Sequence, residues 1–300
     1  MIRPPILVAG DLVAIVATAR SVDRPSMEAA ATTIRSWGFE VAFGNHLFDT
    51  CDQFAGKDQL RLEDLQWAFD NPKIKAILCA RGGYGTSRIL DQINFEKLLQ
   101  TPKWVCGFSD VTALLCHLHK LNLESIHSTM PLLFKRPEHE GSCQSLKNLL
   151  LGESPVLKTK AHVHNQEGQA MGQVVGGNLS ILIHLLGTSS ELDTDDKILF
   201  LEDIDEYLYH IDRMILQLLR AGKLDKLTGL IVGHMTDMND NEISFGKSAY
   251  EIIRSHVRMF NYPVGFAFPL GHDQPNIALP VGRVGQLSVK SDGAELSFKI

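Results

Sequence analysis

The stretch KWVCGFSDVTALLCHLHK, residues 103–120, contains the strand-to-helix junction that decides the fold. An apolar run from Trp104 to Phe108 ends at Ser109. A helical apolar pattern follows at once, at Val111, Leu114, Leu115 and Leu118. A serine at such a turn can hold its hydroxyl clear of the backbone at the positive end of the helix, where nucleophiles of hydrolases are often found. The alternative interpretation is that Ser109 is a helix N-cap, a position that serine commonly occupies.

Upstream of this junction, short apolar runs alternate with amphipathic helical patterns from residue 10 onward. This alternation is typical of a parallel sheet covered by helices on both faces. We expect strands over residues 11–17, 39–44, 73–80 and 103–108, and helices over 25–38, 58–71 and 86–93. Ligands of such sheets bind beyond the C-terminal strand ends, which is where the glycine-rich stretch at 81–85 and Ser109 fall.

The composition changes after about residue 150. Residues 151–178 are polar and rich in Gly, which fits a linker leading into small strands rather than another βα unit. Helices over 179–187 and 206–222, strands over 197–203 and 227–235, and a hairpin within 281–300 are expected to follow. We therefore predict an α/β domain at residues 1–155 and a smaller, β-rich mixed domain at 156–300.

Charge and composition exclude several classes of protein. The chain has 300 residues, 44% hydrophobic, and a formal net charge of -6 without a basic block, so nucleic acid is not an expected partner. Pro4, Pro5 and Gly10 interrupt the apolar N-terminal run, which predicts a first strand of a cytoplasmic protein rather than a membrane anchor. The five cysteines are odd in number and lack a Cys-x-x-Cys pair, so we expect reduced core residues: Cys51, Cys79, Cys106, Cys116 and Cys143.

Two further residues could complete a nucleophile's acid–base machinery. Glu202 stands at the end of the apolar run KILFLE, where a carboxylate can orient a histidine or cap the next helix. Three acidic neighbours compete for that role: Asp203, Asp205 and Glu206. His272 lies in a loop rich in Gly and Pro between two apolar runs, and such a loop exposes a histidine to ligands more than a helix face does.

The stretch RGGYG, residues 81–85, has three glycines in four positions after a predicted strand. Such a loop lets the backbone approach a ligand closely and point its amides at an anion. It lacks the Gly-Lys-Ser/Thr of a phosphate-binding loop and the spacing of a dinucleotide-binding turn, so an oxyanion hole suits it better than a nucleotide site. The alternative is a tight turn into a helix.

These segments together resemble the L,D-carboxypeptidase family of serine peptidases, which includes murein tetrapeptide carboxypeptidases and microcin-immunity peptidases. Six motifs carry the resemblance and occur in the same order along nearly the whole chain. They are GD (10–11), ARGGYGTSRIL (80–90), GFSDVTALL (107–115), VGGNLSIL (175–182), LFLEDIDEYLYHIDRMILQL (199–218) and PLGHDQPNIALPVG (269–282).

The resemblance implies a Ser-Glu-His triad in which Ser109 is the nucleophile, His272 the general base and Glu202 its orienting acid. It also implies an oxyanion hole made by the backbone amides of Gly83 and Asp110. The implied fold is a flavodoxin-like domain followed by a smaller β-rich domain, paired as a homodimer, with no metal or organic cofactor. The first domain would supply the nucleophile and the second the other two residues.

The function that follows is a cytoplasmic carboxypeptidase that removes the terminal D-alanine from murein tetrapeptides during peptidoglycan recycling. A cation should recognise the free carboxylate of this small peptide, and we assign that role to Arg81. Where many family members read His-Gly-Pro, this chain has Ser128 and Thr129 in IHSTMP, which changes the expected pocket shape.

Two alternatives stay open at this point. The first is a microcin-type immunity peptidase acting on peptidyl or aminoacyl nucleotides, which predicts an aromatic-bearing loop that stacks on a base. Trp37, Trp67 and Trp104 all lie in core-like patterns, which disfavours it. The second is a non-catalytic α/β module that binds an anion at residues 81–85.

Overall fold

A computed structural model describes residues 1–298; the end of the expected C-terminal hairpin, residues 299 and 300, lies outside the described residues. The chain divides into two compact units. The first comprises Met1–Glu153 together with Ile277–Pro280. The second comprises Ser154–Asn276 and the chain from Val281 onward. A short segment that follows most of the second unit in sequence thus belongs to the first.

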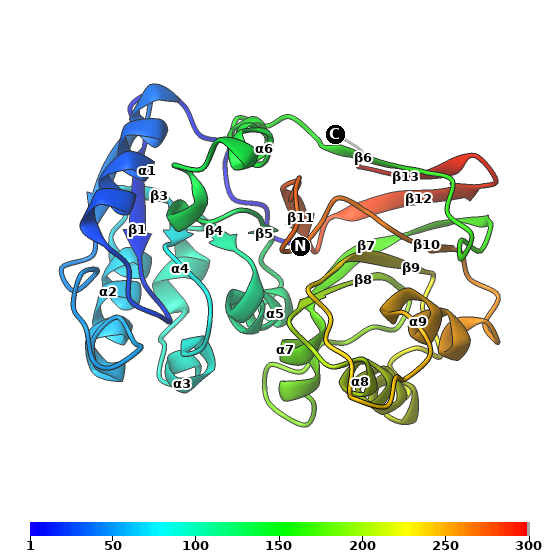
Figure 1. Ribbon diagram of the computed structural model, residues 1–300. Coiled ribbons are helices and arrows are strands. Elements are labelled where there is room, and N and C mark those ends of the chain that lie inside the picture. Colours follow the sequence, from blue (N-terminus) through cyan, green and yellow to red (C-terminus); the bar gives the residue numbers. More distant parts are fainter. Residues whose placement is uncertain (299–300) are drawn as a thin grey trace. The chain divides into compact units, whose positions relative to one another are not determined.

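The first unit is built on a sheet with the strand order β11-β5-β4-β3-β1-β2. Its strands are β1 (Leu12–Val16), β2 (Glu40–Phe43), β3 (Ile74–Cys79), β4 (Trp104–Gly107), β5 (Ser125–His127) and β11 (Leu279–Val281). Every pairing among β1 to β5 is parallel, so their C-terminal ends share one edge (Figure 1). The order 2-1-3-4-5 within this sheet is that of flavodoxin-like folds, which confirms the predicted fold class.

Helices cover both faces of this sheet, as its buried strands require. The helices are α1 (Arg24–Ser36), α2 (Asp58–Asp70), α3 (Thr86–Leu90), α4 (Glu96–Gln100), α5 (Thr112–Lys120) and α6 (Glu140–Leu150), with 3₁₀ turns η1 (Ser109–Val111), η2 (Pro131–Leu133) and η3 (Pro137–His139). Val13 and Ile15 of β1 pack with apolar residues of α1 and α6 in one cluster. Since side chains alternate along a strand, Ala14 and Val16 face the other side, where α2 contacts β1.

The strands and helices expected up to residue 120 are present, but several short elements were not expected. The helix α4 has five residues and β5 has three, too few to show a period in the sequence. The cysteine prediction also needs one correction. Cys79, Cys106, Cys116 and Cys143 are buried and free, whereas Cys51 is half-buried in a polar loop and is not a core residue.

The second unit contains a seven-stranded mixed sheet with the order β10-β9-β8-β7-β12-β13-β6. Its strands are β6 (Val156–Lys160), β7 (Gly168–Asn178), β8 (Lys197–Ile204), β9 (Gly229–Thr236), β10 (Val264–Gly265), β12 (Val284–Lys290) and β13 (Gly293–Phe298). The strands β7 to β10 pair in parallel, whereas β12, β13 and β6 add antiparallel ladders. The expected hairpin is β12–β13, with Lys290 opposite Gly293.

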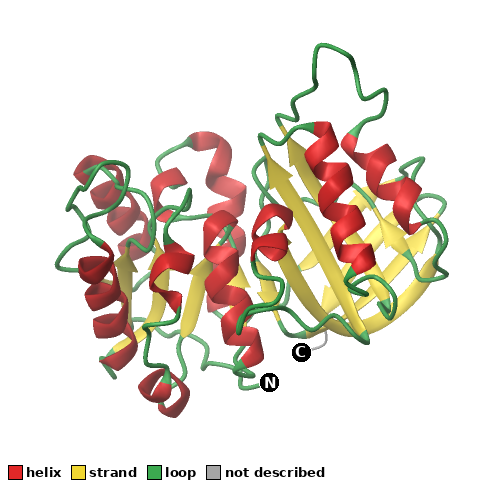
Figure 2. Cartoon of the chain, turned by 90° about the horizontal axis from the view of Figure 1, so that it is seen from below, coloured by secondary structure: helices red, strands yellow, loops and turns green. Residues whose placement is uncertain are grey.

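Three helices lie along one face of β7, β8 and β9 (Figure 1). They are α7 (Leu179–His184), α8 (Leu208–Arg220) and α9 (Ala249–Val257). Figure 2, seen from below, shows these helices in front of the strands. The helices of residues 1–298 include none that is long and apolar enough to cross a bilayer.

Candidate active site

Ser109 occupies a strained turn at the edge of the first unit's sheet. Phe108 is still extended after β4, and Ser109 then turns the chain into η1 with a φ of 60°. This left-handed conformation costs a non-glycine residue about 1–3 kcal/mol, and active sites are one of the places where such strained residues cluster. Its side chain caps neither η1 nor α5, so the N-cap interpretation of this serine is wrong.

Glycine is required on two sides of this turn. A Cβ on Gly107 would lie 2.8 Å from the Val111 side chain, so the tight exit from β4 leaves no room for one. A Cβ on Gly82 would lie 3.1 Å from Ser109 Cβ and 3.3 Å from its Oγ. The glycine-rich loop after β3 therefore packs directly against the serine hydroxyl.

The same loop presents Gly83 with its backbone in the left-handed region, at a φ of 107°. A Cβ there would lie 2.5 Å from the Arg20 side chain. Arg81 is half-buried, and its guanidinium donates to the backbone oxygen of Ser21 at 2.9 Å. Burial, and then the charge of Arg20, lower the pKa of Arg81. Ser128, just after β5, is also close to the turn, because its N–H donates to Gly107 O at 3.1 Å.

Glu202 and His272 meet in the second unit. Glu202 lies near the end of β8 with no exposed surface, and its Oε2 is 2.7 Å from His272 Nδ1. Because a carboxylate only accepts hydrogen bonds, Nδ1 carries the proton and donates. A Cβ on Gly271, whose φ is 115°, would come within 2.8 Å of that same Oε2, so the loop needs glycine there.

The electrostatics of this pair favour a charged imidazole. Burial lowers the pKa of His272, but the charge and the hydrogen bond of Glu202, together with the charge of Asp203, raise it more, and the resulting pKa is above the ordinary value. The histidine therefore loses its proton at a higher pH than a free imidazole does.

The three competing carboxylates are engaged elsewhere. Asp203 accepts from the Ser180 N–H at 2.9 Å and from the Asn178 amide at 2.8 Å, on the side where α7 begins. Burial and the nearby Glu202 charge raise the pKa of Asp203 to about 6. Asp205 accepts from Asn239 at 2.9 Å, and Glu206 lies 2.6 Å from His210.

Sequence reasoning did not single out His234, which lies near the end of β9. Asp203 pairs with Met235 in the β8–β9 ladder. The register of this ladder shifts between Leu201 and Asp203, so Glu202 and His234 lie at an irregularity in the β8–β9 pairing. Burial lowers the pKa of His234, and the charges of Asp273, Glu202 and His272 also act on it. Its position at a strand end, like that of Glu202, is the signal that could have identified it.

Comparisons with known proteins match both parts of the chain to domains of one family. Residues 13–128 match the LD-carboxypeptidase N-terminal domain, and residues 171–287 match the LD-carboxypeptidase C-terminal domain. A putative carboxypeptidase of Synechocystis sp. is 33% identical over 298 residues, covering 99% of this chain and 97% of that protein. The murein tetrapeptide carboxypeptidase of Pseudomonas aeruginosa is 31% identical, with 92% of each chain covered.

Solved structures include a muramoyltetrapeptide carboxypeptidase from Oxalobacter formigenes, with a TM-score of 0.89 and 27% identity over 96% of this chain and 99% of that one. A microcin C7 self-immunity protein, solved in complex with aspartyl sulfamoyl adenosine, has a TM-score of 0.86 at 19% identity over 99% and 98% of the two chains. The second likeness concerns the fold alone. The matches to both domains and the relatives aligned over nearly the full length show that this chain belongs to the LD-carboxypeptidase family.

Proposed function

We propose that this protein is a serine-type L,D-carboxypeptidase that removes the terminal D-alanine from murein tetrapeptides. The observation that carries the proposal is the 2.7 Å contact between the buried Glu202 carboxylate and His272 Nδ1. In a Ser-His-acid triad the acid orients the histidine so that Nε2 transfers the proton, and the strained turn at Ser109 has the character of a nucleophile's position. The substrate class comes from the names of relatives such as the Pseudomonas murein tetrapeptide carboxypeptidase.

In the proposed triad, the α/β domain (residues 1–155) supplies Ser109 and the β-rich domain (156–300) supplies His272 and Glu202. His272 Nε2 accepts the hydroxyl proton while Ser109 Oγ bonds to the carbonyl carbon that precedes the terminal D-residue. The carbonyl π electrons move onto the oxygen. Glu202 keeps the Nδ1–H tautomer and stabilises the imidazolium that forms.

The tetrahedral intermediate then collapses, and the C–N bond to D-alanine breaks. The imidazolium gives its proton to the leaving amine, which leaves an acyl group on Ser109. Water attacks this ester, with His272 Nε2 again accepting and then returning one proton. The shortened peptide is released, and the Ser109 hydroxyl is regenerated.

Backbone amides of Gly83 and Asp110 are the proposed oxyanion hole. The left-handed conformation of Gly83 and the position of Asp110 at the start of η1 are compatible with N–H groups directed at a ligand rather than into secondary structure. We assign recognition of the terminal carboxylate to Arg81. Its bond to Ser21 O uses one of the five donors of the guanidinium, so others remain for a carboxylate.

The wider proposal is a cytoplasmic enzyme of peptidoglycan recycling that acts as a homodimer on a small peptide. The chemistry described uses no metal or organic cofactor, and neither nucleic acid nor membrane is proposed as a partner. A second candidate, a microcin-type immunity peptidase acting on an aminoacyl nucleotide, is favoured by the fold likeness to the microcin C7 self-immunity protein. The three tryptophans all lie at or before residue 104, so a base-stacking loop in the second unit would have to use another aromatic side chain.

One experiment separates these functions. The protein is incubated with a murein tetrapeptide, its pentapeptide precursor and an aspartyl adenylate analogue, and the products are identified by mass spectrometry. We expect loss of one D-alanine from the tetrapeptide alone. Cleavage of the adenylate alone would favour the immunity peptidase. A protein that cleaves none of them and that a fluorophosphonate does not label at Ser109 would be the anion-binding module.

A further inference from the structure

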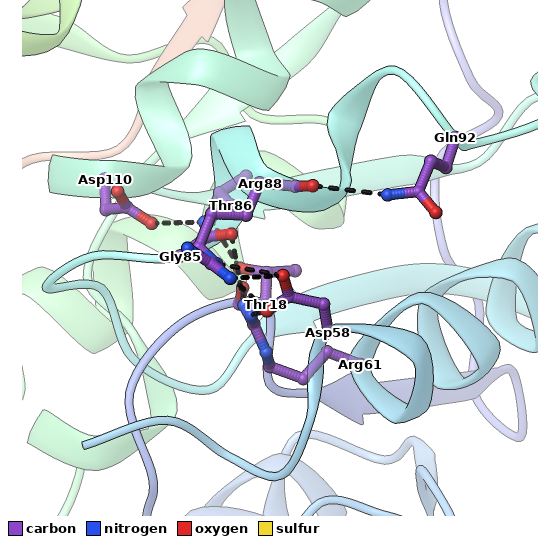
Figure 3. A network of polar contacts seen from close by, with 8 residues as sticks. All are labelled: Thr18, Asp58, Arg61, Gly85, Thr86, Arg88, Gln92 and Asp110. Atoms are coloured by element: carbon purple, nitrogen blue, oxygen red, sulfur yellow. Dashed lines mark hydrogen bonds and ion pairs between the residues drawn. The ribbon is translucent and has the colours of Figure 1, made fainter. Parts of the chain in front are cut away.

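The side chain of Asp110, the residue after Ser109, connects the serine turn to the glycine-rich loop. Asp110 is 2% exposed, and its Oδ2 accepts the backbone N–H of Thr86 at 2.9 Å (Figure 3). Thr86 is the first residue of α3 and follows directly on Gly85, the last glycine of the loop. One carboxylate thus ties the start of η1 to the end of the loop that carries Gly83.

The far side of the loop is held by a second set of polar contacts, some buried and some exposed (Figure 3). Thr86 Oγ1 donates to Thr18 Oγ1 at 2.8 Å, just beyond β1. The guanidinium of Arg61, which is 1% exposed, donates to the backbone oxygens of Thr18 and of Gly85. Asp58 forms ion pairs with both Arg61 and Arg88, and so joins α2 to α3.

Two glycines of the loop lie close to the groups on either side of it. A Cβ on Gly85 would lie 2.5 Å from Arg61 Nη1, and one on Gly82 would lie 3.3 Å from Ser109 Oγ. The loop is therefore packed between the buried arginine and the serine turn. The Asp110 carboxylate is the polar tie on the serine side, whereas the arginine and threonine contacts anchor the other side.

We propose that the Asp110 side chain is a positioning residue that sets the distance between the Ser109 hydroxyl and the Gly83 amide. The inference rests on the proposed function, in which these two groups act on the same carbonyl. Oxyanion stabilisation depends steeply on this geometry, because a displacement of about 1 Å can cost on the order of 100-fold in rate. Loss of the contact between Asp110 and Thr86 would reduce stabilisation of the transition state and leave ground-state binding of the peptide unchanged.

The test compares Asp110→Ala with the wild-type protein. We expect kcat on the tetrapeptide to fall by about 10- to 100-fold, with KM changed by less than about threefold. The inhibition constant of a peptide boronate, whose boron replaces the scissile carbonyl carbon, should rise by the same factor as kcat falls. The dissociation constant of the tripeptide product should stay constant. A kcat within twofold of wild type, or a change confined to KM, would overturn the proposal.

Two further variants separate positioning from charge and from general destabilisation. Asp110→Asn keeps a carbonyl oxygen that accepts the Thr86 N–H, and we expect it to recover most of the loss, with kcat about three- to fivefold below wild type. An Asn variant as impaired as the Ala variant would assign the effect to charge and contradict the tie. Asp64→Ala is the matched control, because Asp64 is 3% exposed and accepts the His46 N–H at 3.0 Å in the same unit. It should lower the melting temperature and leave kcat unchanged.

Should Asp110→Ala fail to fold, Asp110→Ser replaces it. Its hydroxyl is too short to span the distance to Thr86, so its kcat should fall as the Ala variant's is expected to, and a wild-type kcat would overturn the tie. Failure of the proposed function looks different. In that case Ser109→Ala would retain activity, or the unaltered protein would not release D-alanine, whatever the Asp110 variants do.

Discussion

The serine turn of the first unit depends on backbone conformation, whereas the Glu202–His272 pair of the second depends on an interaction between side chains. The turn is made by the backbone: Ser109 has a φ of 60°, and Gly82 and Gly107 sit where a Cβ would meet a neighbour. The pair is made by two side chains, a fully buried carboxylate 2.7 Å from an imidazole nitrogen. Conformation holds the first in place, and electrostatics hold the second.

This difference predicts different consequences of mutation. Changes at the serine turn should alter geometry and lower kcat at every pH. Changes at the Glu202–His272 pair should also alter the pKa of His272 and so shift the pH at which the rate rises. The four predictions that follow use this contrast, in order of expected size.

Ser109→Ala should give the largest effect, a loss of about 10⁴-fold or more in kcat, because the variant has no nucleophile. Stability should change by less than about 1 kcal/mol, since the hydroxyl caps no helix. Product release followed by mass spectrometry and unfolding in urea measure the two quantities. A folded variant that retains more than about 1% of the activity would remove Ser109 as nucleophile.

Glu202→Gln should lower kcat by about 10²- to 10⁴-fold with KM little changed. The amide keeps the size of the side chain but can present a donor to Nδ1, which favours the wrong tautomer. Asp203→Asn and Asp205→Asn should lose less than about tenfold, because both carboxylates have partners other than His272. The three kcat values are compared side by side. If Asp203→Asn has the lowest kcat of the three variants, the orienting acid is Asp203 and not Glu202.

A pair of glycine variants compares the two regions directly. Gly271→Ala would place a Cβ 2.8 Å from Glu202 Oε2. We expect kcat to fall about 10- to 100-fold. We also expect a shift of the acid limb, the part of the pH profile in which the rate rises as His272 loses its proton. Gly82→Ala would place one 3.1 Å from Ser109 Cβ, and we expect a loss of about tenfold with the acid limb in place. Profiles of kcat/KM against pH decide the matter, and equal shifts in both variants would contradict the contrast.

The smallest expected effect is the position of the acid limb itself. The general base must be neutral, and the pKa of His272 is raised by Glu202 against the opposing effect of burial. The rate should therefore rise with pH through a value above about 6.5, the ordinary pKa of histidine. In Glu202→Gln the charge and the hydrogen bond of Glu202 are gone, and only the charge of Asp203 still raises the pKa of His272 against burial. The limb should therefore move to lower pH, although the rate is lower. A limb that stays in place would show that Glu202 does not act on His272.

Much of the fold could be predicted because its signals are local and periodic. The amphipathic pattern of α1 and the buried run of β1 are visible in the sequence, and so is the hairpin β12–β13. The helix α9 was missed although Ser248 and Glu251 form a capping box, a spacing that can be read directly from the chain. The three-residue strand β11 has no such signal, since it exists through its place in the sheet.

The candidate site was predictable in its residue types but not in its contacts. Glu202 and Asp203 are adjacent and acidic, and no pattern in the sequence tells them apart. The structure does so because successive side chains point to opposite faces of β8, one toward His272 and the other toward Ser180. The tie from Asp110 to Thr86 spans 24 positions and involves a backbone N–H, which a sequence motif does not display.

The proposed function requires that His272 activates the Ser109 hydroxyl. It is tested most directly by the rate at which a fluorophosphonate forms an adduct on Ser109, measured by mass spectrometry of the peptide that contains it. The rate of the wild-type protein should rise with pH as His272 loses its proton. His272→Gln should react at about one hundredth of the wild-type rate or below, and its rate should not rise over that pH range. Equal rates in the two proteins, with the same pH dependence, would contradict the account.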